Sequence, residues 1–349
     1  MSTALLAAVA VILCILFRIL NVNSQPQKPA LYCKDLTFLD TILKIAPLLQ
    51  EPYTPTRLWG FSGHVQTIIH SIIGRVRCPW PIGERCYLSL RDGTTLTYDL
   101  YQPLDQSHEG HTGDFSEMLS HILEKHPNTY IVCIGFSLGG NLVTKYMGEA
   151  DRCRSPNIIG GISICQGYCA IEGTKWLLNW QNFRRFYLYV MTESMKSIIL
   201  RHRHILLHDD VKRRYNLKER EIIAAATLPE LDDAYTRKVH NFKSVSELYQ
   251  WSSCVNYLQD INTPMIFINA RDDPIVPEAL LRPVRQFASE HSNALYLELA
   301  HGGHLGFYEG GLVYPNPVTW LDRTLVALVG SLALVNAGST LKTSAAKVQ

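Results

Sequence analysis

The sequence lacks a marked excess of charge of either sign. It has 33 Lys and Arg residues against 31 Asp and Glu residues, which gives a formal net charge of +2 at pH 7. A chain this close to neutrality has no electrostatic footprint for a polyanion, so we expect no nucleic-acid partner. Its 349 residues are enough for one large α/β domain that carries a cap.

Paired cysteine spacing is also missing. The 9 cysteines are scattered and odd in number, which argues against a disulfide framework. Cys165 and Cys169 lack a second pair of ligands, so the sequence predicts no zinc site, and it implies no organic cofactor. There is also no Asn-X-Ser/Thr glycosylation acceptor with an allowed middle residue. These absences favour a reduced domain that faces the cytoplasm.

The N-terminus is strongly apolar. Residues 1–17 are almost wholly hydrophobic, and counting Ile19 and Leu20 past a snorkelling Arg18 gives the length of about 20 residues that a membrane span needs. We therefore predict a single membrane anchor at 1–20, with a cleaved signal peptide as the alternative. Basic residues follow this run, and by the positive-inside rule they would keep the rest of the chain in the cytoplasm.

The remaining sequence divides into a linker and helix, a catalytic domain and a tail. The predicted boundaries are 21–57 for the linker with its helix at Leu36–Leu49, 58–328 for the α/β domain, 172–257 for a helical cap within it, and 329–349 for the C-terminal tail. The apolar runs that predict strands are Arg85–Leu90, Thr95–Tyr101, Tyr130–Ile134, Asn157–Cys165, Met265–Asn269 and Ala294–Ala300.

The motif G-F-S-L-G at residues 135–139 lies between one of these strands and a helix-capable stretch. This is the context of a nucleophile elbow, in which Ser137 is exposed on a tight strand-to-helix turn. We expect Gly135 and Gly139 to be small because a side chain there would collide with the neighbouring strand or helix. The amide of Leu138 is expected to face the oxyanion that forms on an attacked carbonyl.

A serine in this position needs a base and an acid, which should follow it in the order Ser, Asp, His. Asp273 comes directly after the strand at 265–269, and it is our predicted acid, with Asp272 as the alternative. His304 follows the strand at 294–300, and it is our predicted base, with His301 as the alternative. Glycines around these histidines allow the loop to bring an imidazole over the serine.

The predicted cap carries aromatic residues, a basic cluster and a loose acyltransferase pattern. The aromatic residues predict an ordinary helical core, part of which could also line an acyl-chain tunnel. The basic residues at 201–203 and 212–214 are expected to be solvated, with anionic lipid headgroups as the lesser alternative. His204 and Asp209 fit the pattern H-x4-D. The aromatic and apolar residues in question are Trp176, Trp180, Phe183, Phe186, Tyr187, Tyr189 and Met191.

Taken together, the motifs resemble those of the AB hydrolase 4 family of α/β-hydrolase domain-containing acylglycerol lipases, over nearly the whole chain. They are L-W-G at 58–60, S-G-H-V-Q-T at 62–67, G-F-S-L-G-G-N at 135–141, C-Q-G-Y at 165–168, D-D-P at 272–274 and H-G-G-H-L-G-F at 301–307. The resemblance implies a single-pass membrane serine hydrolase that cleaves monoacylglycerols or related lipid esters. Ser137, Asp273 and His304 would be its charge-relay residues. It also implies a type II orientation, which conflicts with the charge and cysteine arguments.

One departure from the family pattern concerns the middle of the sheet. Between Tyr101 and Tyr130 the chain has only a polar stretch and one helix-capable segment, Phe115–Lys125, where the family has a third strand, a helix and a fourth strand. We therefore expect an α/β-hydrolase fold with a helical cap and an N-terminal anchor, but without those two strands. The second oxyanion amide comes from the loop after the third strand, so only that of Leu138 can be assigned.

Three functions remain open on this evidence. The first is a membrane-bound serine esterase or lipase, which the three predicted catalytic residues favour. The second is a catalytically impaired form that acts as a lipid-binding or interaction protein, which the missing strands favour. The third is an acyltransferase that uses the same acyl-enzyme. The sequence leaves the acyl chain, the head group and the oligomeric state undetermined.

Overall fold

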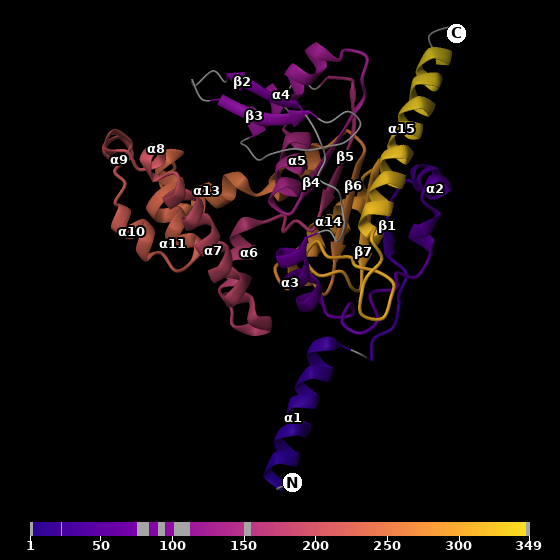
Figure 1. Ribbon diagram of the computed structural model, residues 1–349. Helices are drawn as coiled ribbons and strands as arrows, with labels where there is room; N and C mark the ends of the chain where they lie inside the picture. Colours follow the sequence, from indigo (N-terminus) through magenta and orange to yellow (C-terminus); the bar gives the residue numbers. More distant parts are fainter. Residues whose placement is uncertain are drawn as a thin grey trace.

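The computed structural model describes residues 3–21, 23–74, 84–89, 95–100, 112–149 and 155–346. Its main sheet has five strands in the order β1-β7-β6-β5-β4 (Figure 1). Strands β4 to β7 run parallel to one another, and β1 pairs antiparallel with β7 at the edge. The strands are β1 (Ala30–Tyr32), β4 (Ile131–Phe136), β5 (Ile158–Ile164), β6 (Met265–Ala270) and β7 (Ala294–Leu299).

The sheet is buried on both faces because its strands are apolar at nearly every position. In β6, Met265 and Phe267 join the apolar cluster on one face, whereas Ile266 and Ile268 join the cluster on the other. Alternating side chains point to opposite faces of a strand, so a continuous apolar run suits a parallel sheet that is covered on both sides.

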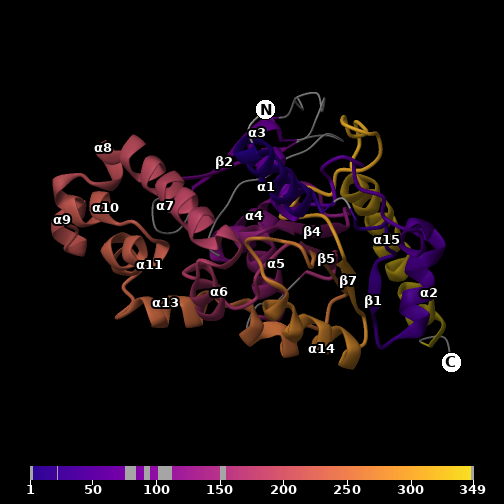
Figure 2. The same ribbon diagram turned by 90° about the horizontal axis from the view of Figure 1, so that it is seen from below.

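Helices cover each face of this sheet, as Figures 1 and 2 show from two directions. On one face lie α5 (Leu138–Gly148) and α14 (Arg282–Glu290), and on the other lie α2 (Leu36–Ile45) and α15 (Trp320–Ala346). Helix α2 is shorter than predicted. Residue Pro47 disfavours the helical conformation at Ala46, and the chain continues as a 3-10 turn, Pro47–Gln50.

The predicted cap is helical throughout and inserts between β5 and β6. Its helices are α6 (Ala170–Leu177), α7 (Arg184–Arg201), α8 (Arg203–Leu206), α9 (Asp209–Tyr215), α10 (Glu219–Ala224), α11 (Leu228–Leu231), α12 (Arg237–Val239) and α13 (Val245–Ser252), with short 3-10 or π turns at 181–183, 232–236 and 254–260. The cap has an apolar cluster of its own. Its members are Ile199, Leu207, Leu217, Ile222, Ala225, Leu231 and Ala234.

Most of the aromatic residues that were predicted to form the core of the cap lie at its surface. Trp180, Phe183, Phe186 and Tyr189 are exposed, between 51% and 74% of their surface, so they do not form a cap core. They lie before and within the first turns of α7, away from the aliphatic cluster, where the chain passes over α3 (Gly63–Ile73). In the first two turns of α7, the aromatic side chain that is buried is that of Tyr187.

The expected gap in the sheet is present in the described residues. Strands β2 (Glu84–Ser89) and β3 (Thr95–Leu100) pair only with each other, in a separate two-stranded sheet. The one described element between β3 and β4 is the helix α4 (Thr112–Lys125), and residues 101–111 lie outside the description. Strand β3 therefore does not close the gap by pairing with β4, which is the last strand of the main sheet.

Two helices bear on the predicted membrane anchor. Helix α1 (Thr3–Leu20) points away from the body (Figure 1), and its apolar stretch Ala7–Leu20 is shorter than a membrane span. Within the described residues, only Trp320–Gly338 of α15 is long and apolar enough to cross a membrane, and 33% of that stretch is buried. The domain boundary predicted at residue 328 falls inside α15. The helix still belongs to the domain beyond that residue, because Leu332 packs into the core together with Leu328.

Candidate active site

Ser137 lies on the turn between β4 and α5, and its backbone is strained. Its φ is 51° and its ψ is −118°, a conformation that non-glycine residues rarely adopt. The turn is tight because a Cβ atom at Gly135 would lie 2.1 Å from the carbonyl oxygen of Gly139. A strained serine at a strand-to-helix turn is the geometry of a nucleophile elbow.

The explanation predicted for the second glycine of the motif needs correction. A Cβ atom at Gly139 would meet no described atom within 4 Å, so no collision requires glycine at that position. The close approach occurs at Gly140, where a Cβ atom would lie 2.7 Å from the hydroxyl oxygen of Ser163 on β5. The helix thus approaches the sheet one residue later than the motif suggests.

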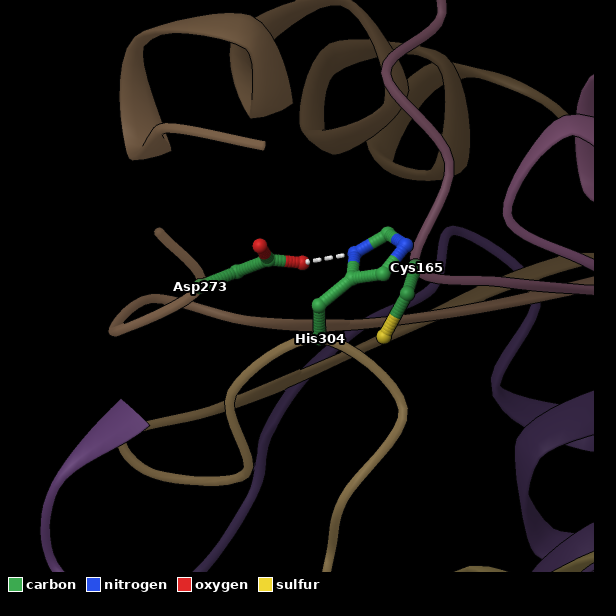
Figure 3. A group of neighbouring side chains, drawn as sticks. All are labelled: Cys165, Asp273 and His304. Atoms are coloured by element: carbon green, nitrogen blue, oxygen red, sulfur yellow. Dashed lines mark hydrogen bonds and ion pairs between the residues drawn. The ribbon is translucent and has the colours of Figure 1, made fainter. Parts of the chain in front are cut away.

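The imidazole of His304 connects Ser137 to Asp273. Its Nε2 lies 2.8 Å from the Ser137 hydroxyl, and its Nδ1 lies 2.7 Å from a carboxylate oxygen of Asp273. Figure 3 shows the carboxylate facing the imidazole, with a dashed line that marks the bond to Nδ1. The structure thus brings together the three residues that the sequence singled out, from the ends of β4, β6 and β7.

The carboxylate of Asp273 is held by the backbone as well as by His304. Its Oδ1 accepts hydrogen bonds from the amides of Ile275 at 2.7 Å and Val276 at 2.9 Å, and the residue is only 2% exposed. Because one oxygen is occupied by two amides, only the other is left to bind the imidazole. This fixes the orientation of the carboxylate.

The two alternative residues pair with each other, away from Ser137. The Nδ1 atom of His301 lies 3.4 Å from Asp272, and its Nε2 lies 2.7 Å from the hydroxyl of Ser24. The amide of Gly303 donates to Asp272 at 2.9 Å. Burial raises the pKa of Asp272, although the bonds from His301 and Gly303 oppose this shift. The Asp272–His301 pair therefore ties the loop after β7 to the loop after β6.

Helix α3 supports the same loops, a role that the sequence did not reveal. The Thr67 hydroxyl accepts from the amide of His304 at 2.8 Å, and a Cβ atom at Gly63 would lie 1.9 Å from the Asp272 carbonyl. The side chain of Gln66 is fully buried, and it bonds to the Tyr308 amide and the Gly60 carbonyl. Gly63, Gln66 and Thr67 belong to the segment 62–67, which the sequence singled out only as one of the motifs of the family resemblance.

A family model described as the alpha/beta hydrolase fold matches residues 93–311. The chain belongs to this family. The hydrolase is 59% identical over 391 aligned positions to Abhydrolase domain-containing protein 2 of Drosophila melanogaster, covering 96% of this chain and 98% of the relative. It is 34% identical over 387 positions to Monoacylglycerol lipase ABHD2 of Homo sapiens, covering 94% and 91%.

Among solved structures, the hydrolase is similar to the esterase domain of a Rhodothermus marinus protein. The two are 13% identical, with a TM-score of 0.38, over 73% of this chain and 99% of that one. A likeness this weak supports no conclusion about this chain. The alignment with the Drosophila relative is more informative, because its 391 positions exceed the 349 residues of this chain. At least 42 aligned positions therefore have no residue in this hydrolase.

Leu138 carries the one predicted oxyanion amide that the structure places beside Ser137. The amide of Leu138 opens α5 directly after Ser137, where backbone N–H groups face outward from the helix N-terminus. The second donor of this fold comes from the loop after the third strand. No described strand or loop of this hydrolase occupies that place.

Cys165 lies beside the imidazole of His304 (Figure 3). Its sulfur, one nitrogen of His304 and one oxygen of Asp273 all lie within 4.8 Å of one another, so the three could serve as ligands of a metal ion. Burial raises the pKa of the Cys165 thiol well above its usual range, which favours the neutral form. A metal ion bound to Nδ1 would also have to displace the hydrogen bond between Asp273 and His304.

The cap of the hydrolase meets α3 above these residues. The hydroxyl of Tyr187 lies 2.9 Å from His64 Nδ1, and the two rings stack with centroids 5.8 Å apart. Burial lowers the pKa of His64 and raises that of Tyr187 to about 12, so both groups are neutral near pH 7. At the base of the cap, the Asn141 amide donates to Ser252 and accepts from Cys254.

The other predicted features of the cap lie at its outer end, in and around α8 and α9 (Figure 1). His204 and Asp209 are both exposed, and Asp209 pairs with Lys212 at 2.9 Å rather than with His204. In the basic cluster, Arg203 pairs with Glu219 and Arg213 with Asp210. These exposed pairs fit the solvated reading of the cluster.

Proposed function

We propose that this hydrolase cleaves carboxylic esters of lipids, most readily monoacylglycerols, through an acyl-serine intermediate. The observation that carries the proposal is the continuous hydrogen-bonded chain from Ser137 through His304 to Asp273. The names of the relatives support the substrate class, since several are monoacylglycerol lipases. Hydrolysis would yield a fatty acid and glycerol.

In the first step, the Ser137 hydroxyl attacks the ester carbonyl while His304 Nε2 takes its proton. Asp273 keeps the proton of Nδ1 in place and stabilises the imidazolium that forms. The amide of Leu138 donates to the oxyanion. The imidazolium then protonates the leaving alcohol, the carbon–oxygen bond breaks, and a water molecule activated by His304 releases the acyl group as the acid.

The single assigned oxyanion donor limits the expected rate. The loss of one such donor typically costs about 10²–10³ in kcat. We therefore expect this chain to form the acyl-enzyme more slowly than relatives that have the missing segment. The alternative of a catalytically impaired form rests on the same observation, and the experiment below separates the two.

We also propose that α1 anchors the hydrolase to a membrane. Nine of its large apolar side chains are more than 40% exposed, which is costly in water but favourable in lipid. Helix α3 lies on the side of the body where α1 leaves it (Figures 1 and 2), and it exposes Ile68, Ile72 and Ile73. Deletion of residues 1–20 should move the chain from the membrane fraction to the soluble fraction. Retention in the membrane fraction would refute the anchor.

The test of function is labelling of the purified, detergent-solubilised chain with a fluorophosphonate probe, beside hydrolysis of monooleoylglycerol. Labelling and hydrolysis should both be lost in Ser137→Ala and retained in Ser163→Ala, a matched control for a buried serine of β5. A second chain should carry the segment of the Drosophila relative that is missing here. If only that chain labels, the present form is the impaired one. If neither labels, the proposal is wrong.

A further inference from the structure

Among the residues that the structure describes, Arg184 is a buried cation without a counterion. It is the first residue of α7, and it keeps only 7% of its surface exposed. Its Nε has no hydrogen-bond partner, and no carboxylate of the described residues forms an ion pair with its guanidinium. A buried charge in this state is destabilising unless something else neutralises it. This arrangement is typical of an anion-binding site.

The neighbours of Arg184 connect it to the active site. Tyr187, one helical turn further along α7, bonds to His64 at the start of α3, the helix that supports the loop of His304. The negative charge of Asp273 acts on Arg184 and opposes the lowering of the Arg184 pKa by burial. Arg184 is therefore close enough to Asp273 for the two charges to interact, but the two side chains form no ion pair.

Two further features favour an anion at this place. The N-cap residue of the 18-residue helix α7 is Phe183, which makes no side-chain cap hydrogen bond. The amide of Arg184 donates to the Gln181 carbonyl of the preceding turn, so no side chain caps the positive end of the helix dipole. The indole of Trp176 lies 5.6 Å from the guanidinium carbon and forms one wall of the site. An aromatic wall holds a guanidinium in place while its N–H groups bind a planar or tetrahedral oxyanion.

The position of Arg184 indicates which part of a substrate it would contact. The acyl carbonyl must lie at Ser137 and the amide of Leu138, both in the body of the hydrolase. The acyl chain itself is apolar and has no acceptor or negative charge to which a guanidinium could bind. The remaining part of a lipid ester is its head group, which the cap would meet.

We propose that Arg184 binds the phosphate of a lipid ester, so that phosphorylated monoacylglycerols are substrates of this hydrolase. This inference rests on the proposed function and extends its substrate class from neutral to anionic head groups. The guanidinium would form two parallel hydrogen bonds to phosphate oxygens, an arrangement that lysine cannot reproduce.

Binding is tested first without catalysis, in the Ser137→Ala chain, by calorimetry with octyl phosphate, octanol and inorganic phosphate. We expect octyl phosphate to bind and Arg184→Gln to weaken that binding by about 10- to 100-fold. Octanol should be insensitive to the substitution. Tighter binding of inorganic phosphate than of octyl phosphate would instead assign the site to free phosphate. Equal binding of octyl phosphate with arginine and with glutamine at position 184 would overturn the proposal. Arg185→Gln is the matched control, because it removes the same charge from the next, exposed residue.

Hydrolysis of monooleoylglycerol and of its phosphate ester is then compared in the active chain. Arg184→Gln should lower the ratio of kcat/KM for the phosphate ester to that for the neutral ester by about 10- to 100-fold, and Arg184→Lys should recover only part of it. A purely structural role would lower both rates together and leave the ratio unchanged. If wild type cleaves only the neutral ester, this inference fails while the proposed function stands. If it cleaves neither, the proposed function fails, and the binding measurement still decides whether Arg184 binds phosphate.

Discussion

Replacing Asp273 by asparagine would change one charge at the active site and keep the shape of the side chain. The oxygen that accepts from the amides of Ile275 and Val276 must remain an acceptor, so the new amide nitrogen has to face His304 Nδ1. Nδ1 then loses its proton to Nε2. An Nε2 that carries a proton cannot take another from the Ser137 hydroxyl, 2.8 Å away.

The wrong tautomer costs about 10⁴ in kcat in serine hydrolases of this design. That is about 5.5 kcal/mol of transition-state stabilisation, far more than the loss of one hydrogen bond. We expect a fall of this size in kcat for p-nitrophenyl butyrate and a matching fall in the rate of fluorophosphonate labelling. The melting temperature should change little, because the two backbone hydrogen bonds are kept.

Asp272→Asn is the matched control. Its oxygen would still accept from Gly303, and its amide would face His301, which has no contact with Ser137. We expect a loss of less than about tenfold, because only positioning is affected. If Asp272→Asn lost as much activity as Asp273→Asn, or if Asp273→Asn kept more than a tenth of the activity, the assignment of the acid would be wrong.

Three further predictions concern the supports of the site. Gly135→Ala should abolish labelling, because its Cβ would overlap a backbone oxygen, whereas Gly139→Ala should label normally. Leu328→Ala should lower the free energy of unfolding in urea by about 2–5 kcal/mol, because Leu328 is fully buried; no loss would mean that α15 lies in a membrane instead of the core. Burial lowers the pKa of His64, so the unfolded chain binds a proton there before the folded one does. Stability should therefore fall as the pH drops below about 6.5, and His64→Gln should flatten that part of a melting curve against pH.

The order of the elements and the three central residues could be predicted because both depend on local pattern. The apolar run predicted at 265–269 is β6 to within one residue, and the run at 294–300 is β7. In a parallel sheet, residues after neighbouring strand ends must meet at one edge. That rule places Ser137, Asp273 and His304 at the same edge of the sheet, although β5 separates β4 from β6.

What could not be predicted depends on contacts between distant segments. The pairing of β1 with β7 joins residues more than 260 positions apart, and three residues carry no pattern that reveals it. The role of α3 depends on Thr67 meeting the backbone of His304, 237 positions away. Likewise, the exposure of Phe183 and Phe186 follows from where α7 passes over α3, and not from their spacing.

The cap has a core of its own, separate from the two clusters that flank the sheet. Every residue that would handle the ester bond comes from the body, whereas Arg184, Tyr187 and the exposed aromatic residues come from the cap. Residues 170–257 can therefore be replaced or substituted during evolution without disturbing the turn that holds Ser137. A cap grafted from a relative should bring that relative's head-group preference with it while the chemistry remains that of this chain.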